Sequence, residues 1–364
     1  MSAKSAISGC RRSRSTRIAD RSRRSLVAAA LVVAAACGGS GGQPAAPTAP
    51  TEVVAQFDQL WATFDRVYSY FDYKRIDWNA LRAEFAPRVA GATETQLVML
   101  VQEMLGRLHD QHVVLTNGST TLRTYVPGYS FNWDNGVWQQ YLARGNAQVR
   151  GGAVSAVFDG VPYIAVQSWD PGRVSVSNLD TFLDAFRDRP ALILDVRMNP
   201  GGNDQLAFDF AGRFATATTI SGFTQVRNGP GHSDFTPRQA RTFSPRGSFQ
   251  FTRPVLLLIG RFCASSNESF IAAMQQLPQV TLVGDTTGGA TANPQTFMLG
   301  GGWSYTVSRW IEYTAGGQVI EDQGIAPGIA VPVSAGDFQG GRDPVLDYAI
   351  ARAATQPTSS ERRD

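Results

Sequence analysis

The chain has 364 residues, of which 43% are hydrophobic, 17% charged and 10% aromatic, with a formal net charge of +3 at pH 7. This composition is that of an ordinary globular protein and excludes a wholly disordered, collagen-like or coiled-coil chain, and the length predicts about two domains. Residues 1–36 hold eight basic residues and one acidic residue, so the remainder carries 3 − 7 = −4 and no nucleic-acid partner is expected.

Residues 1–37 are typical of a bacterial signal peptide that ends in a lipobox-like cysteine. The basic stretch precedes an apolar run, residues 26–36 (LVAAALVVAAA), which is too short to cross a bilayer as a helix. The small residues Ala35 and Ala36 before Cys37 are typical of lipoprotein processing, in which this cysteine becomes the acylated N-terminus. Ordinary signal cleavage and an uncleaved anchor are the alternatives.

Residues 38–52 contain many glycine, proline and alanine residues and are predicted to be a flexible linker. Leader and linker together predict an exported protein of the bacterial cell envelope, lipid-anchored on the periplasmic or outer surface. Beyond the leader, Cys263 is the only cysteine, so no disulfide framework is expected and the core alone must hold the exported fold.

Residues 53–115 show helical periodicity and are expected to form a small N-terminal helical domain. Thr93 and Gln96 can form a capping box between its two apolar stripes. The stripes consist of Val53, Phe57, Leu60, Trp61, Phe64 and Val67, and of Leu97, Leu100, Val101, Met104, Leu105 and Leu108.

Residues 116–350 alternate short apolar strands with helices, which predicts an α/β (α+β) core. The stretch 221–250, rich in Gly, Pro, Ser and Arg, is expected to be a surface insertion, and residues 351–364 a disordered tail. No room remains for a separate peptide-binding module of about 90 residues. The expected strands are 153–157, 162–166, 191–195, 255–259, 280–283 and 304–308, and the expected helices 176–187, 203–214 and 267–277.

The segment 191–202 (ALILDVRMNPGG) is the first candidate for chemistry. A buried strand ends at Asp195 and Arg197 and runs into Gly201 and Gly202. Paired glycines at the end of a strand allow backbone N–H groups to point into a cleft, as an oxyanion hole requires. The alternative is a tight turn that an Asp–Arg pair fastens.

The segment 255–277 is the second candidate. Its apolar strand breaks at Gly260, and Ser265 and Ser266 precede an amphipathic helix. A serine at the start of a helix lies where the helix dipole and free N–H groups stabilise negative charge, which suits a nucleophile whose intermediate carries an oxyanion. The alternative is that the serine only caps the helix.

The chain has three histidines, His109, His112 and His232. A serine nucleophile needs a base with a pKa near neutrality, and histidine is the most frequent choice. His232 lies in the Gly/Pro-rich stretch, which is poorly suited to hold a base rigidly. His109 and His112 could bind a metal by their spacing, but no other ligand motif supports this, so neither a metal nor another cofactor is expected.

Five segments, in this order, resemble the tail-specific, tricorn-type serine peptidases, which belong to the C-terminal processing peptidase superfamily. The family patterns D-L-R-x-N-x-G-G, S-A-S-x-x-E, V-G-E-x-T-x-G, E-x-x-G-V-x-P and D-P-x-L are similar to residues 195–202 (DVRMNPGG), 262–268 (FCASSNE), 283–289 (VGDTTGG), 321–327 (EDQGIAP) and 343–346 (DPVL). The resemblance implies a ClpP/crotonase-like core behind the helical domain, in a branch without a PDZ module.

The resemblance also implies a site. It places the nucleophile at Ser265, three residues before Glu268. In the processing-peptidase branch a lysine base follows at the place of Ala290, but residues 280–300 contain no lysine. The tricorn-like branch instead pairs the serine with a histidine in an L-x-D-x-H segment, which selects His112 over His109.

The carboxylate that orients this histidine would be Glu321, with the adjacent Asp322 as the alternative. Backbone N–H groups of Gly201 and Ser266 would then form the oxyanion hole.

The function implied is that of an exported serine peptidase. It would cleave peptide bonds through an acyl-enzyme on Ser265, with His112 as general base. Its expected partners are a peptide or protein substrate and, through the lipid anchor, a membrane. The alternative is a non-catalytic binding protein on the same fold, which would hold an apolar ligand or a peptide, as the retinoid-binding relatives of the family imply.

Overall fold

The computed structural model describes residues 51–356. The predicted signal peptide, Cys37 and most of the predicted linker lie outside the described residues, as does the end of the predicted tail. Two of the predicted bounds need correction. Helix α1 (Glu52–Val67) is capped by Thr51, within the predicted linker, and helix α10 (Pro344–Ala354) continues past residue 350, so residues 351–354 are helical.

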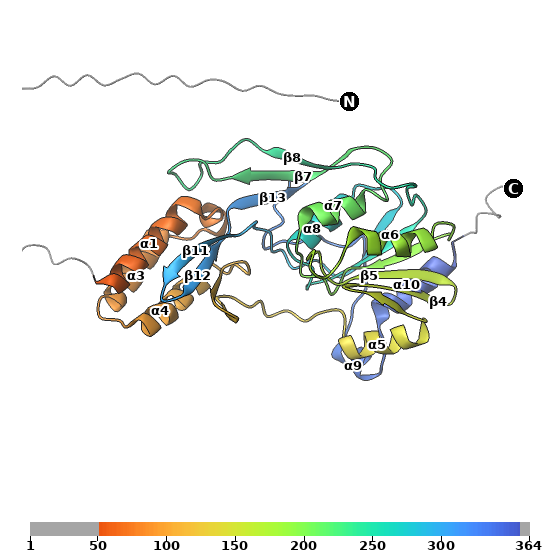
Figure 1. The fold of residues 1–364 in the computed structure, drawn as a ribbon, viewed down its shortest axis with the longest axis horizontal. Helices are drawn as coiled ribbons and strands as arrows, with labels where there is room; N and C mark the ends of the chain where they lie inside the picture. Colours follow the sequence, from red (N-terminus) through yellow and green to blue (C-terminus); the bar gives the residue numbers. More distant parts are fainter. Residues whose placement is uncertain (1–50, 357–364) are drawn as a thin grey trace, which may run out of the picture. The chain divides into compact units, whose positions relative to one another are not determined.

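The N-terminal region is helical, as predicted (Figure 1). After α1 follow α2 (Phe71–Lys74), α3 (Trp78–Val89) and α4 (Glu94–Gly106). Thr93 and Gln96 form the predicted capping box at the start of α4, which satisfies backbone N–H groups that the first helical turn leaves free. The apolar stripes of α1 and α4 bury a core rich in aromatic side chains.

Strands from two distant segments of the chain complete this helical core. β1 (Val114–Asn117), β2 (Thr120–Arg123), β11 (Gln295–Gly300) and β12 (Trp303–Val307) form an antiparallel sheet in the order β11-β12-β1-β2. Tyr305 of β12 stacks on Phe64 of α1, with ring centroids 5.7 Å apart. Residues 49–364 therefore cluster as one unit, and the predicted boundary at residue 115 stays a prediction.

The core of the molecule is a seven-stranded sheet in the order β14-β10-β9-β6-β5-β4-β3. The strands from β14 to β5 are parallel, whereas β4 and β3 are antiparallel to their neighbours. Their bounds are β3 (Gln148–Arg150), β4 (Ala153–Phe158), β5 (Val161–Val166), β6 (Leu192–Asp195), β9 (Val255–Ile259), β10 (Val280–Gly284) and β14 (Ile329–Ala330).

Helices cover both faces of this sheet (Figure 1). On one face lie α6 (Val176–Ala185), α7 (Asp204–Ala211) and α8 (Ser266–Met274); on the other lie α5 (Asn135–Arg144) and α10, and a short helix, α9 (Ala335–Gln339), precedes α10. Because both faces are buried, the central strands are apolar along their whole length, as in β9 (VLLLI). The predicted α/β fold class is confirmed.

The stretch 221–250 is not the simple surface insertion that its composition predicts. β7 (Thr219–Val226) and β8 (Gln239–Phe243) pair with β13 (Trp310–Thr314) in a third sheet, in the order β13-β7-β8. Glycine is required within β7, because a Cβ at Gly222 would lie 2.2 Å from the carbonyl oxygen of Tyr313. A glycine that suggested a loop in the sequence therefore permits a close strand contact.

Candidate active site

Ser265 lies on the turn between β9 and α8, at the carboxyl edge of the parallel sheet. Its backbone has φ 58°, in the left-handed region that residues other than glycine rarely adopt. The Ser265 N–H donates to the carbonyl of Ala290 at 2.7 Å, which holds this conformation. Ser265 is the N-cap residue of α8, but its hydroxyl makes no capping hydrogen bond. The side chain is therefore not engaged as the helix cap that the sequence allowed.

Gly201 packs directly on this turn. Its φ is +110°, and a Cβ at Gly201 would lie 2.8 Å from the Cβ of Ser265 and 3.2 Å from the backbone nitrogen of Ser266. The hydroxyl of Ser266 donates to the carbonyl of Gly202 at 2.8 Å. The two segments predicted to carry chemistry, 191–202 and 255–277, therefore meet at Ser265, because β6 and β9 are neighbouring parallel strands.

The backbone donors around Ser265 differ from the prediction in one respect. The N–H of Gly201 donates to the side-chain oxygen of Asn199 at 2.8 Å and is already engaged. Within residues 51–356, the N–H groups of Gly202 and Ser266 make no hydrogen bond. The prediction of Ser266 as an oxyanion donor is compatible with this geometry, whereas Gly202, not Gly201, offers the free N–H from the glycine pair.

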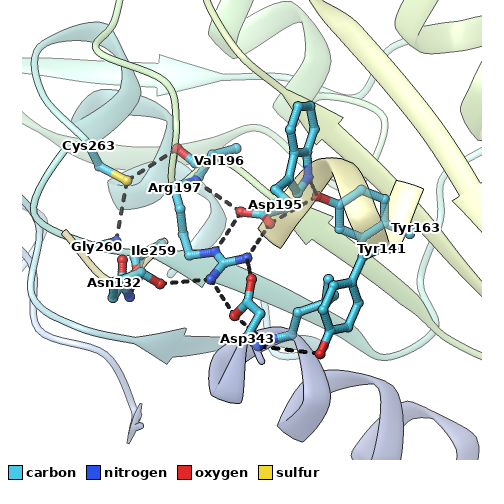
Figure 2. A network of polar contacts seen from close by, with 12 residues as sticks. Asn132, Tyr141, Tyr163, Asp195, Val196, Arg197, Ile259, Gly260, Cys263 and Asp343 are labelled. Atoms are coloured by element: carbon cyan, nitrogen blue, oxygen red, sulfur yellow. Dashed lines mark hydrogen bonds and ion pairs between the residues drawn. The ribbon is translucent and has the colours of Figure 1, made fainter. Parts of the chain in front are cut away.

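Asp195 and Arg197 form a buried ionic network (Figure 2). The fully buried Arg197 guanidinium donates to both carboxylate oxygens of Asp195, at 3.0 and 2.8 Å, and to both of Asp343, at 2.9 and 2.8 Å. This pairing fastens the strand end, as the alternative interpretation of the segment proposed. It also joins the first of the five motif segments to the last, since Asp343 belongs to residues 343–346.

Glu268 is buried beneath the turn and holds the segment 287–290 in place. It accepts hydrogen bonds from the hydroxyl of Thr287, from the N–H of Gly289 at 2.9 Å and from the N–H of Ala290 at 2.8 Å. Burial raises the pKa of Glu268 to about 7, against these three donors. The carbonyl of Ala290 in turn accepts the N–H of Ser265. The buried Glu268 therefore supports the Ser265 turn through Ala290.

His112 is partly buried in the segment that links α4 to β1. The backbone N–H of His112 donates to Asp110 Oδ1 at 2.8 Å, and its backbone carbonyl accepts from the hydroxyl of Thr306. Its ring nitrogen Nδ1 is buried without a hydrogen-bond partner among residues 51–356, as is Asp110 Oδ2. Burial lowers the pKa of His112; the charge of Asp110 opposes this, and that of Lys74 adds to it. No hydrogen bond joins His112 to Ser265 in the described chain.

Glu321 is buried, not a solvated hairpin charge. Its Oε1 pairs with Lys74 Nζ at 2.9 Å, and its Oε2 accepts the N–H of Thr291 at 3.0 Å. Burial and the nearby Asp110 carboxylate raise the pKa of Glu321 well above its ordinary value. Asp322 also pairs with Lys74, at 2.7 Å, but its side chain is 43% exposed. Neither carboxylate donates or accepts a hydrogen bond with His112 within the described residues.

Lys74 is the site residue that sequence reasoning missed. It ends α2, with only 5% of its side chain exposed, and it contacts Glu321, Asp322 and the carbonyl of His109. No local sequence pattern identifies this lysine, because its carboxylate partners lie far along the chain. Asp322, for example, is 248 residues away. The charges of Asp110 and Lys74 shift the pKa of both Glu321 and His112. Glu321 and His112 therefore lie in one electrostatic cluster.

The other two histidines have different surroundings. His109 has φ 48° and stacks on Tyr125, with ring centroids 4.9 Å apart. His232 pairs with Asp65 at 2.9 Å, and its ring packs at a tilt against Phe71. His232 is thus held in place, contrary to the expectation from its composition, because the stretch around it folds against the helical region.

Ser265 opens into a cavity of about 220 Å³. Ser266, Ser269 and Glu312 line it, together with Asp204 and Trp310. Thr291 also lines this cavity, and its N–H binds Glu321. Thr291 therefore connects Glu321 to the cavity in front of Ser265.

The α/β fold and the serine at this turn resemble those of the tail-specific and tricorn-type peptidases. Residues 160–331 match the model of peptidase family S41, and residues 49–106 match that of the tricorn protease C1 domain. The resemblance to the tail-specific and tricorn-type peptidases that the five motifs predict is thus confirmed.

Similar proteins carry related descriptions. The carboxyl-terminal-processing protease of Synechocystis sp. is 32% identical over 120 residues, and tricorn protease homolog 1 of Streptomyces coelicolor is 30% identical over 168 residues. These matches cover 32% and 45% of this chain, but only 26% and 14% of those proteins. A crystal structure from Parabacteroides merdae, described as that of a peptidase, superposes with a TM-score of 0.75 at 29% identity and covers 83% of this chain and 96% of that one.

Proposed function

We propose that the protein is a serine peptidase that cleaves peptide bonds through an acyl-enzyme on Ser265, with His112 as general base. The observation that carries the proposal is the turn at Ser265. A serine held at positive φ, with a hydroxyl that caps nothing, faces a cavity beside two unengaged backbone N–H groups at the start of a helix. A mere helix cap would need none of these features.

In this proposal the Ser265 hydroxyl attacks the substrate carbonyl, and an imidazole nitrogen of His112 takes its proton and returns it to the leaving amine. Nε2 is the acceptor, since Nδ1 is buried away from solvent. The N–H groups of Ser266 and Gly202 hold the oxyanion, and each such donor contributes about 3 kcal/mol in other enzymes. Water then attacks the acyl-enzyme and releases the acid product, with His112 again as base.

In this proposal Glu321 does not bind His112 directly, because Lys74 and Thr291 engage both of its carboxylate oxygens. It acts through these two residues. The Glu321–Lys74 pair fixes the segment that carries Thr291 against the residues around His112. Asp110, which shares the L-x-D-x-H segment, supplies the negative charge that favours the imidazolium formed during attack.

A fluorophosphonate probe tests the proposal directly, because it reacts only with an activated serine. We expect the wild-type protein to be labelled at Ser265, the Ser265→Ala variant not to be labelled, and the Ser177→Ala variant, on the exposed surface of α6, to retain labelling. A folded wild-type protein that stays unlabelled and hydrolyses no peptide would contradict the proposal and favour the non-catalytic binding protein.

We also propose that the protein is exported and anchored to a membrane by lipid on Cys37. The basic leader, the apolar run 26–36 and the small residues before the cysteine support this. Within residues 51–356, no helix combines the length and the apolar character needed to cross a membrane.

A further inference from the structure

We propose that the cavity beside Ser265 receives the substrate side chain that precedes the cut bond and selects lysine or arginine through Glu312. This inference rests on the proposed peptidase function and adds the substrate class to it. In an acyl-enzyme, that side chain branches from the carbon next to the carbonyl bound to Ser265. It must therefore enter a space that Ser265 itself lines, as it does in this cavity.

The route from Ser265 to Glu312 follows one turn of helix α8. Ser265 and Ser269 lie four residues apart and both line the cavity, about 6 Å from each other along the helix axis. The Ser269 hydroxyl donates to Glu312 Oε1 at 2.8 Å. A side chain on the acyl group must span about one helical turn to reach this carboxylate, which a lysine or arginine can do and a short side chain cannot.

Two carboxylates of the cavity wall, those of Glu312 and Asp204, share one guanidinium. The guanidinium of Arg241 binds Glu312 and Ser269 with Nη1 and Asp204 with Nη2, so one cation faces two carboxylates. Arg241 is itself held between the rings of Phe208 and Trp310, with its guanidinium carbon 4.8 and 5.0 Å from the two centroids. If both acids are ionised, the net charge of this group is −1, and a substrate cation would balance it.

The second oxygens of both acids are available for that cation. Glu312 Oε2 and Asp204 Oδ1 make no hydrogen bond to any residue in the range 51–356. Glu312 is only 4% exposed, and burial raises its pKa, as expected of a carboxylate without a full set of partners. An ammonium or guanidinium group would supply a charge-assisted hydrogen bond there.

The size and the walls of the cavity agree with this substrate class. About 220 Å³ accommodates one long side chain but not a folded segment of peptide. Trp310 and Pro294 offer apolar surface to the methylene stem, whereas Asn293 and Thr291 add polar groups to the wall. An apolar side chain such as leucine would bury Glu312 Oε2 without a partner and is therefore disfavoured.

The test is a set of peptides that differ only in the residue before the cut bond, together with fluorophosphonate labelling of the same samples. We expect kcat/KM for arginine or lysine to exceed that for leucine about ten- to a hundredfold, the range of a hydrogen bond to a charged group. In Glu312→Gln this ratio should fall about tenfold or more. The ratio cancels any general loss of activity. The matched control is Glu103→Gln, an ion-paired glutamate on the surface of α4, which should keep the wild-type ratio.

A second readout does not depend on hydrolysis or on a buried substitution. Agmatine, a small guanidinium amine, should slow fluorophosphonate labelling of wild-type Ser265, and this protection should weaken in Asp204→Asn, whose side chain is more exposed than that of Glu312. Labelled wild-type protein that cleaves leucine peptides as well as arginine peptides, or that agmatine does not protect, would overturn the inference and leave the peptidase proposal standing. Absence of labelling would overturn both.

Discussion

The partly buried imidazole of His112 lies among charges of both signs. Asp110 favours its protonated form, and Lys74 disfavours it, while burial lowers the pKa of the ring overall. A general base must be neutral to accept a proton, so peptidase activity should be lost as the pH falls through the pKa of His112. A lowered pKa extends the active range toward acid.

The two charges predict opposite shifts of the pH profile. Asp110→Asn removes a negative charge, so the pKa of His112 should fall and the acidic limb of kcat/KM should move to lower pH. Lys74→Met removes a positive charge, so the pKa should rise and the limb should move to higher pH. The measurement is kcat/KM against pH for the two variants and the wild type. Shifts in the same direction, or no shift, would show that another group is the base.

His112 and His109 form a natural pair for a second prediction. His112→Ala should lower kcat/KM by about 10²–10⁴, the usual contribution of a general base. His109→Ala should keep most of the activity, because this ring stacks on Tyr125 and no bond to Ser265 or Glu321 involves it. Steady-state hydrolysis of one peptide by both variants decides the matter. Near-normal activity of His112→Ala would refute the assignment of the base.

Among the elements, the ends of β6 and β9 and the start of α8 form the frame of the site. Arg197 follows β6 and lies between Asp195 and Asp343, so it ties the end of this strand to the start of α10 (Figure 2). No residue of the network lines the Ser265 cavity. We therefore expect its loss to affect the stability of the fold first.

Arg197→Met tests this role. It leaves two carboxylates in a fully buried place without their cation, and it should lower the free energy of unfolding by about 3–5 kcal/mol. Denaturant unfolding is the measurement. Arg88→Met is the matched control, because Arg88 pairs with Glu103 on the helix surface, where both side chains are more than 40% exposed, and little change is expected. Equal stability of Arg197→Met and the wild type would show that the network contributes nothing to the fold.

At the scale of the whole molecule, the chain combines a predicted membrane tether with a folded part that contains the site. Residues 38–364 carry a formal charge of −4, which disfavours adsorption to anionic lipid. Membrane association should therefore depend on acyl chains attached to Cys37 and should resist high salt, which screens electrostatic binding.

Palmitate labelling of the wild type and of Cys37→Ser tests the tether. The wild type should incorporate label and sediment with membranes in high salt, whereas Cys37→Ser should be unlabelled and appear in the soluble fraction or as an uncleaved precursor. An unlabelled, soluble wild type cleaved within residues 34–42 would indicate ordinary signal cleavage. Labelling of Ser265 by the fluorophosphonate should be the same in either case.

Much of the fold could be predicted because the signals are local. The strand at 255–259 is a run of apolar residues between breaks, and the capping box at Thr93 needs only residues three positions apart. The stretch 221–250 could not be predicted, because its glycines mark a loop in the sequence. Gly222 is required instead by the carbonyl of Tyr313, a residue far along the chain.

The sequence by itself determined the α/β core, the family motifs and the serine at the start of α8. Each of these depends on residue type and short spacing, which the order of residues states directly. Only the tertiary structure decided that Lys74 binds Glu321, that Asn199 occupies the N–H of Gly201, and that Glu312 lies beside Ser269. The ion pair and the Ser269–Glu312 contact join residues far apart in the chain, and the Gly201 N–H bond depends on which way a side chain turns. The two long-range contacts follow from the order of strands in the sheets and the packing of helices on them, which no local pattern contains.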